Sequence, residues 1–351
     1  YTVTEADPAG VGPGYRLFSL ACADTDPNGT PTTVDVDTRT ATINVDSGEL
    51  VICEFGNNEA ETVVVEKRTL PPGGSGFQFL DNIGTPNFFF LGDAETRTFT
   101  RVPPGDYFVQ ENTNALPPGY KLTAIDCNVE GQSVAGNLET GAANINLTQP
   151  GGSAHCTFTN TELGTIAMIK QTLPNGAAES FGYTINGPDY SDSGSLADTQ
   201  LGVVDNAQPG TWTLAETLPS ADWHLGNISC TSTLGTSTFT NDIDNLKTTV
   251  ELAPGDTMDC TFTNVEDETI TVEKVTVPAG DTSTSFNFTG TGSIGGFALK
   301  DGETQSFSVD PEAGPYILTE DDPSGDGYEV TEIRCVNTQT GDTTLGDVGT
   351  R

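Results

Sequence analysis

The chain is poor in basic residues, with 13 Lys and Arg against 50 Asp and Glu, and its formal net charge is −37. Binding to nucleic acid or to an anionic membrane surface depends on basic patches, so the charge argues against both partners. The sequence also lacks an apolar run near the ~20 residues that a spanning helix needs, so we expect no membrane insertion. The acidic surface instead favours solubility.

Histidine is scarce as well, and none of the seven Cys stands in a Cys-x-x-Cys pair. A zinc site is therefore not expected. The sequence shows no nucleophile–base constellation and no phosphate-binding loop, so we expect no enzyme activity on an external substrate. Cys spread evenly through a β-rich sequence indicates disulfides formed in an oxidising compartment, and hence an extracellular or cell-surface location.

One short segment has the spacing of a metal loop. Asp24, Asp26 and Asn28 precede Gly29 as at the start of a calcium-binding loop. The other repeats lack this pattern at the same place, so an ordinary turn is the favoured interpretation. Calcium is the weaker candidate, and we expect no other cofactor.

Turn formers are abundant, with 40 Gly and 21 Pro, and they separate short runs rich in Thr, Val and Phe. Turn signals recur every 8–15 residues, and no helical period or heptad is present. This pattern predicts an all-β fold built from β-sandwiches.

Self-comparison shows a repeat of about 104 residues, the size of one β-sandwich domain. Strands that begin with Tyr or Trp and end in Glu recur at this period, as do strands ending in Lys, segments ending in Asn and two Cys positions. These positions are Glu5, Glu111, Glu216 and Glu320; Lys67, Lys170 and Lys274; Asn57, Asn160 and Asn264; Cys22, Cys127, Cys230 and Cys335; and Cys53, Cys156 and Cys260.

The phase of the repeat divides the chain into four parts. A complete unit runs from the Lys strand to the Asn strand, which gives complete repeats at 61–162 and 163–267. Residues 1–60 form the C-terminal part of a preceding repeat, and residues 268–351 form the N-terminal part of a following one. We therefore expect the protein to continue on both sides.

Strand alternation places the recurring polar residues on apolar faces, because side chains at i, i+2 and i+4 of a strand share a face. Ile166 and Met168 lie on the same face as Lys170, and Trp212 and Leu214 lie on the same face as Glu216. Each complete repeat thus directs one Lys, one Glu and one Asn inward. Leaving such groups buried without partners costs several kcal/mol each.

Two interpretations account for these groups. The first is a buried Lys–Glu ion pair with the Asn hydrogen-bonded beside it. The second is a covalent Lys–Asn isopeptide bond, since burial favours the neutral, nucleophilic amine and the protonated acid. That acid can hydrogen-bond the carboxamide oxygen during attack and then shuttle protons as ammonia leaves. The residue pattern alone leaves both interpretations open.

A known family combines the same motifs. The first complete repeat has Lys67 at the end of its first strand, Glu111 at the end of a Tyr-x-x-x-Glu strand, a turn at Pro118-Gly119-Tyr120, and Asn160 in a Phe-x-Asn segment. This combination resembles the collagen-adhesin B-type, SpaA-like repeat of bacterial surface adhesins and pilins. The resemblance extends over essentially the whole chain, and it implies tandem Ig-like, prealbumin-like (transthyretin-like) β-sandwiches in a linear array.

The resemblance also implies which residues react. In that family a Lys and an Asn form an intramolecular isopeptide bond, and the acid catalyses it. The implied bonds are Lys67–Asn160, assisted by Glu111, and Lys170–Asn264, assisted by Glu216. The partial repeats contribute the acids Glu5 and Glu320, and the pairing residues Asn57 and Lys274, whose partners would lie outside the chain.

The repeat favours disulfides within each unit, although spacing alone does not fix their connectivity. The within-unit pairs are Cys22–Cys53, Cys127–Cys156 and Cys230–Cys260. We expect the partner of the seventh Cys, Cys335, to lie beyond Arg351.

The distance from each Asn to the following Lys is constant at ten residues, which indicates short, stiff junctions. Together these features predict a structural repeat of an extracellular fibre, pilus-like filament or adhesin stalk, with other copies of the same protein as partners. The alternative is a ligand-binding surface adhesin module that binds a host or cell-surface ligand and is stabilised by disulfides without isopeptide bonds. An enzyme or carbohydrate-binding module is less favoured, because no unit carries its own cluster of acids or aromatics.

Overall fold

The computed structural model describes residues 1–6, 15–25, 29–149 and 151–349. Nearly all elements in these ranges are β-strands, and the helical segments among them are three short 3₁₀ turns. None of the described helices has the length and apolar character to cross a membrane. The predicted all-β class is confirmed.

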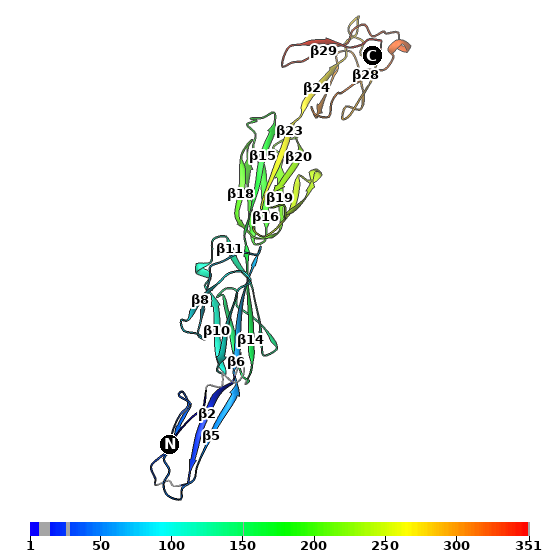
Figure 1. Cartoon of the computed structure of the whole chain (residues 1–351). Coiled ribbons are helices and arrows are strands. Elements are labelled where there is room, and N and C mark those ends of the chain that lie inside the picture. The colour runs from blue at the N-terminus through cyan, green and yellow to red at the C-terminus, as the bar shows by residue number, and fades with distance from the viewer. Residues whose placement is uncertain (7–14, 26–28, 150, 350–351) are drawn as a thin grey trace. The chain divides into compact units, whose positions relative to one another are not determined.

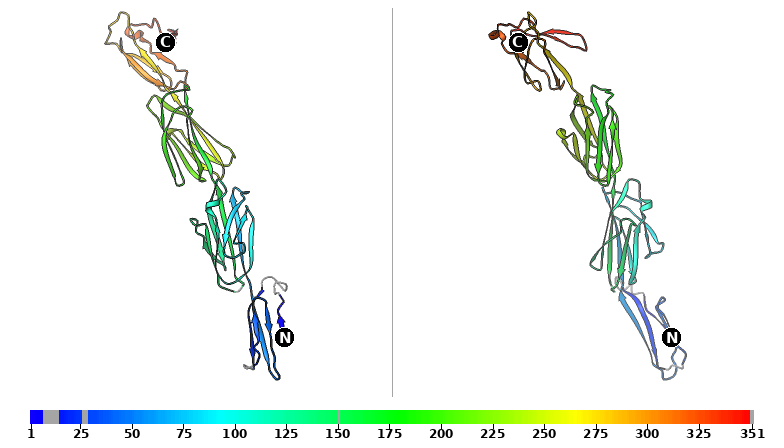
Figure 2. Two further views of the ribbon diagram at one scale, coloured as in Figure 1. Left: turned by 90° about the vertical axis from the view of Figure 1, so that its left-hand side faces the viewer. Right: turned by 180° about the vertical axis from the view of Figure 1, so that it is seen from behind.

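The chain forms two compact units. The first comprises Tyr1–Thr165, Asn206–Pro209 and Ala253–Asp256, and the second comprises Ile166–Asp205, Gly210–Leu252 and Thr257–Arg351. Figure 1 labels the main strands of both, and Figure 2 shows the same strands from two further directions.

The N-terminal segment of the first unit contains a three-stranded sheet, in the order β1-β4-β3, and a two-stranded sheet of β2 and β5. Its small core contains Leu17, Leu20 and Ala41. The strand bounds are β1 (Thr2–Thr4), β2 (Tyr15–Asp24), β3 (Thr33–Asp35), β4 (Thr40–Thr42) and β5 (Val51–Glu59).

The first complete repeat is a sandwich of a four-stranded sheet, β13-β10-β7-β8, and a five-stranded sheet, β12-β11-β14-β6-β9. Alternate residues of both sheets, such as Val65 of β6 and Phe79 of β7, meet in one apolar core. The bounds are β6 (Glu61–Leu70), β7 (Phe77–Asp81), β8 (Phe88–Leu91), β9 (Thr96–Val102), β10 (Gly105–Glu111), η2 (Thr113–Ala115), β11 (Tyr120–Val129), β12 (Gln132–Ala135), β13 (Ala142–Leu147) and β14 (Ser153–Glu162).

The first and last strands of this repeat lie side by side and run parallel. In their register Lys67 of β6 is opposite Phe158 of β14, and Thr69 is opposite Asn160. The strand that begins the repeat and the strand that ends it are therefore hydrogen-bonded neighbours within one sheet, which brings the Lys and the Asn together.

The second complete repeat, in the second unit, has a four-stranded sheet, β18-β15-β23-β20, and a five-stranded sheet, β17-β16-β19-β22-β21. Phe181, Trp212 and Phe262 are buried in its core. The bounds are β15 (Gly164–Leu173), β16 (Phe181–Gly187), β17 (Tyr190–Leu196), β18 (Leu201–Ala207), β19 (Gly210–Thr217), β20 (Trp223–Ser232), β21 (Thr238–Asp242), η3 (Ile243–Asn245), β22 (Lys247–Leu252) and β23 (Thr257–Glu266).

The C-terminal segment of the second unit is built from smaller sheets, β24-β27, β26-β25-β28 and β29-β30. Phe286, Phe288 and Leu299 form its core. The bounds are β24 (Glu268–Glu273), β25 (Phe286–Gly290), β26 (Gly296–Leu299), β27 (Thr304–Val309), β28 (Leu318–Glu320), η4 (Pro323–Asp326), β29 (Arg334–Val336) and β30 (Thr343–Leu345).

Each Asn strand continues almost directly into the next Lys strand. One residue separates β5 from β6, β14 from β15, and β23 from β24, and the three residues are Ala60, Leu163 and Asp267. This is the local structure behind the constant ten-residue spacing in the sequence, since both flanks of every junction are strand.

Candidate functional site

The site of the first complete repeat is centred on the amine of Lys67. Alternation along β6 turns this side chain into the core beside Val65, and its side chain is fully buried. The Nζ atom donates to the Oδ1 of Asn160 at 2.8 Å and to the main-chain oxygen of Phe158 at 3.0 Å. The lysine of the first strand and the asparagine of the last are therefore in direct contact.

Glu111 of β10 brings a carboxyl group to the same place from the opposite sheet. It is fully buried, and its Oε1 lies 3.9 Å from the Nζ of Lys67. Burial raises the pKa of Glu111 to about 7, although Lys67 and Asn160 act in the opposite direction. Burial also lowers the pKa of Lys67 to about 8, against the attraction of Glu111 and Asp93.

The second complete repeat brings together Lys170 of β15, Glu216 of β19 and Asn264 of β23. The Nζ of Lys170 donates to the Oδ1 of Asn264, and it lies 3.3 Å from the Oε2 of Glu216. The Nδ2 of Asn264 donates to the Oε1 of Glu216 at 2.5 Å. Burial lowers the pKa of Lys170 and raises that of Glu216, so both move towards their neutral forms.

The orientation of this amide differs from the sequence-based expectation, in which the acid bonded the carboxamide oxygen. In the structure the oxygen of Asn264 faces Lys170 and the nitrogen faces Glu216. The reason is that the amine of Lys170 is a donor and requires an acceptor, which leaves the amide NH₂ to the carboxyl group. The acid therefore contacts the nitrogen that would leave as ammonia.

An aromatic ring lies against each lysine amine, a contact that the sequence analysis missed. The Nζ atoms of Lys67, Lys170 and Lys274 lie 4.4, 4.0 and 4.2 Å from the ring centres of Phe77, Phe181 and Phe286. Each ring offers the amine the face of a π-system. The signal in the sequence is a Phe that opens the strand after each Lys strand.

A β-bulge opposite each Asn was also missed. The antiparallel registers shift between Leu122 and Ala124 in one repeat, and between Leu225 and Asn227 in the next. Leu122 pairs with Asn160, and Leu225 pairs with Asn264. Bulges re-aim side chains beside functional sites, and these ones lie next to Asn160 and Asn264.

The flanking segments hold parts of the same site. Lys274 donates to the Oε1 of Glu320 at 2.7 Å in the C-terminal segment. In the N-terminal segment the Nδ2 of Asn57 donates to the Oε1 of Glu5 at 2.6 Å. A Lys–Glu pair and an Asn–Glu pair thus each form separately.

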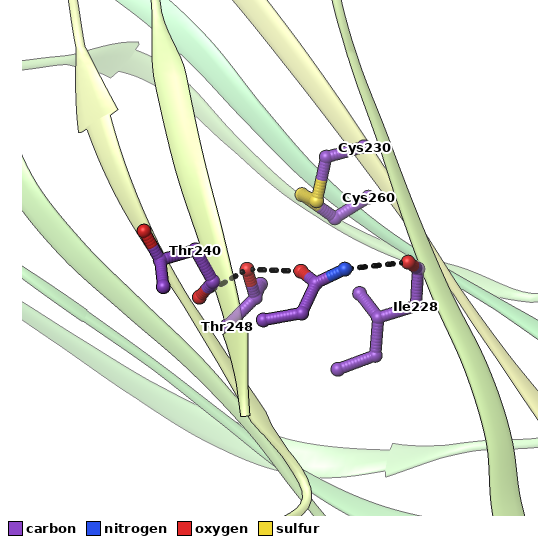
Figure 3. Close-up of a disulfide and its surroundings, with 6 residues drawn as sticks. Ile228, Cys230, Thr240, Thr248 and Cys260 are labelled. Atoms are coloured by element: carbon purple, nitrogen blue, oxygen red, sulfur yellow. Dashed lines mark hydrogen bonds between the residues drawn. A yellow bond between two sulfur atoms is a disulfide. The ribbon is translucent and has the colours of Figure 1, made fainter. Parts of the chain in front are cut away.

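Disulfides join Cys22 to Cys53, Cys127 to Cys156, and Cys230 to Cys260. Each links two residues that lie directly opposite on neighbouring antiparallel strands. Figure 3 shows the third bond, with Ile228 and Thr248 among the residues drawn around it. Asn241 donates to the main-chain oxygen of Ile228 and accepts from Thr248. The second and third bonds connect the Asn strand to its neighbour four residues before the Asn.

The remaining predicted positions are Cys335 and the three calcium candidates. Cys335 on β29 is exposed, and among the described residues it has no disulfide partner. Of the calcium candidates, Asp24 ends β2, whereas Asp26 and Asn28 lie outside the described residues. In the described ranges no group of three or more His, Cys, Asp or Glu is placed to hold a metal ion.

The chain is a modular β protein, built from tandem two-sheet sandwiches. In each complete repeat the first strand and the last strand are neighbours in one sheet. The family model for the SpaA-type "Prealbumin-like fold domain" matches residues 63–162 and 166–266, more than half of the chain. The chain therefore belongs to the SpaA-type prealbumin-like family, and the resemblance inferred from its motifs is confirmed.

Solved structures with similar folds include a Bacillus anthracis protein, TIE, at 13% identity and a TM-score of 0.28, covering 90% of this chain and 54% of that one. The major pilin protein (T-13) of Streptococcus pyogenes has 13% identity and a TM-score of 0.24, with 59% and 97% covered. The pilus adhesin SpaC of Lactobacillus rhamnosus GG has 12% identity and a TM-score of 0.29, with 96% and 51% covered. The chain thus spans about half the length of TIE and of SpaC. No curated protein matches the sequence.

Proposed function

We propose that this chain is a structural segment of an extracellular fibre, pilus-like filament or adhesin stalk, and that isopeptide bonds cross-link its complete repeats. The observation that carries the proposal is the buried contact between a Lys amine and an Asn carboxamide, with a Glu carboxyl group beside them. It occurs in both complete repeats, between Lys67 and Asn160 and between Lys170 and Asn264.

The bond requires no outside reagent. The neutral amine of Lys67 attacks the Cγ of Asn160, a C–N bond forms, and the bond from Cγ to Nδ2 breaks. One proton leaves the amine and one reaches the departing nitrogen, so the products are a secondary amide and ammonia. Glu111 can carry this proton, because a pKa of about 7 makes both of its protonation states accessible near neutral pH.

The geometry of the first repeat favours this reaction over a simple buried ion pair. A buried pair is stabilising only when its charges meet in close, fully hydrogen-bonded contact. In this repeat the amine of Lys67 lies 2.8 Å from the amide oxygen of Asn160 but 3.9 Å from the nearest carboxyl oxygen of Glu111. The amine thus contacts the electrophile more closely than the countercharge.

The position of the bond gives it a mechanical role. Lys67 and Asn160 are 93 residues apart in the sequence, yet they lie on neighbouring parallel strands at the start and end of the repeat. Tension that enters along β6 would cross to β14 through the bond, and the chain between them would carry none. The repeat could then not be pulled open, which raises its kinetic stability.

The disulfides support the proposed location. Bonds of this kind persist in oxidising environments outside the cytosol. We propose other copies of the same protein as partners in a fibre or surface array, and a host or cell-surface ligand as a further partner of the stalk. The catalysis is confined to the chain's own Lys and Asn side chains.

Intact mass of the reduced full chain tests the proposal. We expect a deficit of two ammonia molecules, one for each complete repeat, and cross-linked peptides that join Lys67 to Asn160 and Lys170 to Asn264. Lys67→Met should restore one ammonia, whereas Lys274→Met should leave the deficit unchanged. Full mass, with the four residues recovered in separate peptides, would contradict the proposal.

A further inference from the structure

A short turn in three of the repeats carries an aspartate whose carboxylate reaches the end of the Lys strand. The turn has the pattern Leu-x-Asp-x-Glu or Leu-x-Asp-x-Gln in all three. Its central residues are Asp93, Asp198 and Asp301, which follow the lysines by 26, 28 and 27 residues. The turn connects the strand that leaves the opposite sheet to the edge strand beside the Lys strand.

The aspartate bonds two main-chain NH groups just after the lysine. In the first repeat Asp93 accepts from the NH of Thr69 at 2.7 Å and from the NH of Gly73 at 3.1 Å. In the second repeat Asp198 accepts from the NH of Thr172 and of Gly176, each at 2.8 Å. Both carboxylate oxygens are used, so the chain leaving each lysine is held at two points.

The same turn also holds the main chain of the lysine itself. The NH of Lys67 donates to the oxygen of Glu95 at 3.0 Å, and its oxygen accepts from the NH of Ala94 at 2.8 Å. In the second repeat Lys170 exchanges the same two bonds with Gln200 and Thr199, both at 2.9 Å. The main chain is therefore fixed at the lysine and immediately after it.

The C-terminal segment contains the same arrangement around Lys274. Asp301 accepts from the NH of Thr276 at 2.7 Å and from the NH of Gly280 at 2.5 Å. Lys274 there contacts Glu320 and the ring of Phe286. The aspartate turn thus accompanies the recurring lysine in all three places where that lysine occurs.

Fixing the main chain matters because a lysine side chain has four rotatable bonds and loses about 2 kcal/mol of rotamer entropy when it is immobilised. The reaction needs its amine within a few tenths of an ångström of the line of attack, and a misplacement of about 1 Å can cost on the order of 100-fold in rate. Both lysines lie three residues before their strands end, at Leu70 and Leu173, where an unsupported end would fray.

We propose that Asp93 and Asp198 are positioning residues for isopeptide bond formation, which hold the lysine main chain so that its amine meets the acid and the incoming asparagine. This inference rests on the function proposed above. The carboxylates contact no reacting atom, so their effect passes through the lysine that they position.

The test compares Asp198→Asn with Asp205→Asn in the full chain. Asn keeps the size of the side chain but replaces one acceptor with a donor that faces an NH group. Asp205 is an exposed aspartate of the same repeat and serves as the control. The fraction of Lys170–Asn264 cross-linked peptide is followed during cell-free synthesis, with the Lys67–Asn160 peptide of each molecule as an internal standard.

We expect Asp198→Asn to slow bond formation in the second repeat at least about tenfold and to leave the first repeat unchanged. Both Trp residues of the chain, Trp212 and Trp223, are buried in the second repeat, so their fluorescence reports its folding separately. The variant should reach the native fluorescence at the rate of the wild-type chain. A rate of bonding equal to that of Asp205→Asn, or failure to reach native fluorescence, would overturn the positioning role.

The pH profile provides a second readout. The carboxylates around Lys170 are Glu216 and Asp198, and both raise its pKa. If the lysine stays buried, removing the charge of Asp198 should lower the pKa of Lys170. The rate of bond formation should then begin to rise at a lower pH, and the maximum rate should be lower. A rise displaced to higher pH would mean that water has entered a loosened repeat, and the positioning role would fail. A wild-type chain of full mass would instead refute the isopeptide function itself.

Discussion

The complete repeats and the flanking segments contain the same residues at different degrees of burial. Asn160 and Asn264 are fully buried, whereas Asn57 of the N-terminal segment is exposed. The side chain of Lys67 is fully buried, whereas that of Lys274 is 14% exposed. Both segments nevertheless form their Glu contact, Lys274 with Glu320 and Asn57 with Glu5.

This comparison separates assembly from activation. The Lys–Glu and Asn–Glu contacts occur in the flanking segments, whereas in the first complete repeat the Asn strand lies beside the Lys strand and burial lowers the pKa of Lys67 to about 8. A lysine with ordinary solvation stays protonated and is not a nucleophile. Bond formation should therefore be limited to repeats in which both strands are present.

The largest effect should follow from removing the acid of a complete repeat. Glu111→Gln keeps the shape of the side chain but cannot transfer protons, so bonding in the first repeat should slow by about 10²–10⁴-fold. Cross-linked peptide yield over time measures this. Glu320→Gln is the matched control, and it should not change either complete repeat. Equal yields from wild-type and Glu111→Gln chains would count against an acid-assisted reaction.

Removing the lysine should distinguish the repeats by stability. A bond across 93 residues stabilises by about 4–5 kcal/mol on the chain-entropy model, so Lys67→Met should lower the Tm of its repeat by roughly 20–30 °C. Lys274→Met removes only a partly exposed ion pair, worth about 1 kcal/mol or less. Calorimetry measures both changes. Similar losses for the two variants would mean that Lys67 acts as an ion-pair partner alone.

Reducing the disulfides should destabilise the N-terminal segment more than the first complete repeat. Cys22–Cys53 spans 31 residues and contributes about 3–4 kcal/mol to a segment in which the described residues supply no Lys for Asn57. Cys127–Cys156 closes a loop that lies inside the one closed by Lys67 and Asn160, so its loss should cost less. Hydrogen exchange with and without reductant measures the loss of stability in the N-terminal segment and in the first complete repeat. A larger loss of protection in the complete repeat would refute this expectation.

The pH dependence of bonding is the smallest expected effect. The reaction needs a neutral Lys67, and with a pKa of about 8 this amine is mostly protonated below pH 8. It also needs a protonated Glu111, and with a pKa of about 7 this acid is mostly ionised above pH 7. The rate in the first repeat should therefore peak between pH 7 and 8 and fall about tenfold per pH unit on either side. A rate that still rises at pH 10 would mean that the lysine is solvated.

The inward Lys, Glu and Asn could be predicted from the sequence, because every second side chain of a strand points to the same face of the sheet. The period of the repeat also indicated which residues belong together. Lys170, for example, follows two apolar residues on its own face, and its strand is buried in that pattern. The all-β class and the family followed from the same signals.

The supporting contacts could not be predicted in this way. Whether Phe181 covers the amine of Lys170 depends on the order of strands across two sheets, which alternation does not encode. The bulge between Leu225 and Asn227 is a shift of register, which is visible only once two strands are paired. The role of Asp198 depends on bonds to main-chain NH groups, which leave no mark on hydrophobic patterning.

The disulfide between β11 and β14 has a consequence for damage by proteases. The segment between Cys127 and Cys156 includes Leu138, which is 46% exposed and available to an enzyme that cuts after apolar residues. A nick there would leave both fragments tethered through the sulfur atoms, and the bond proposed between Lys67 and Asn160 would hold them together even after reduction. Such nicks would therefore accumulate in the protein without the release of a fragment.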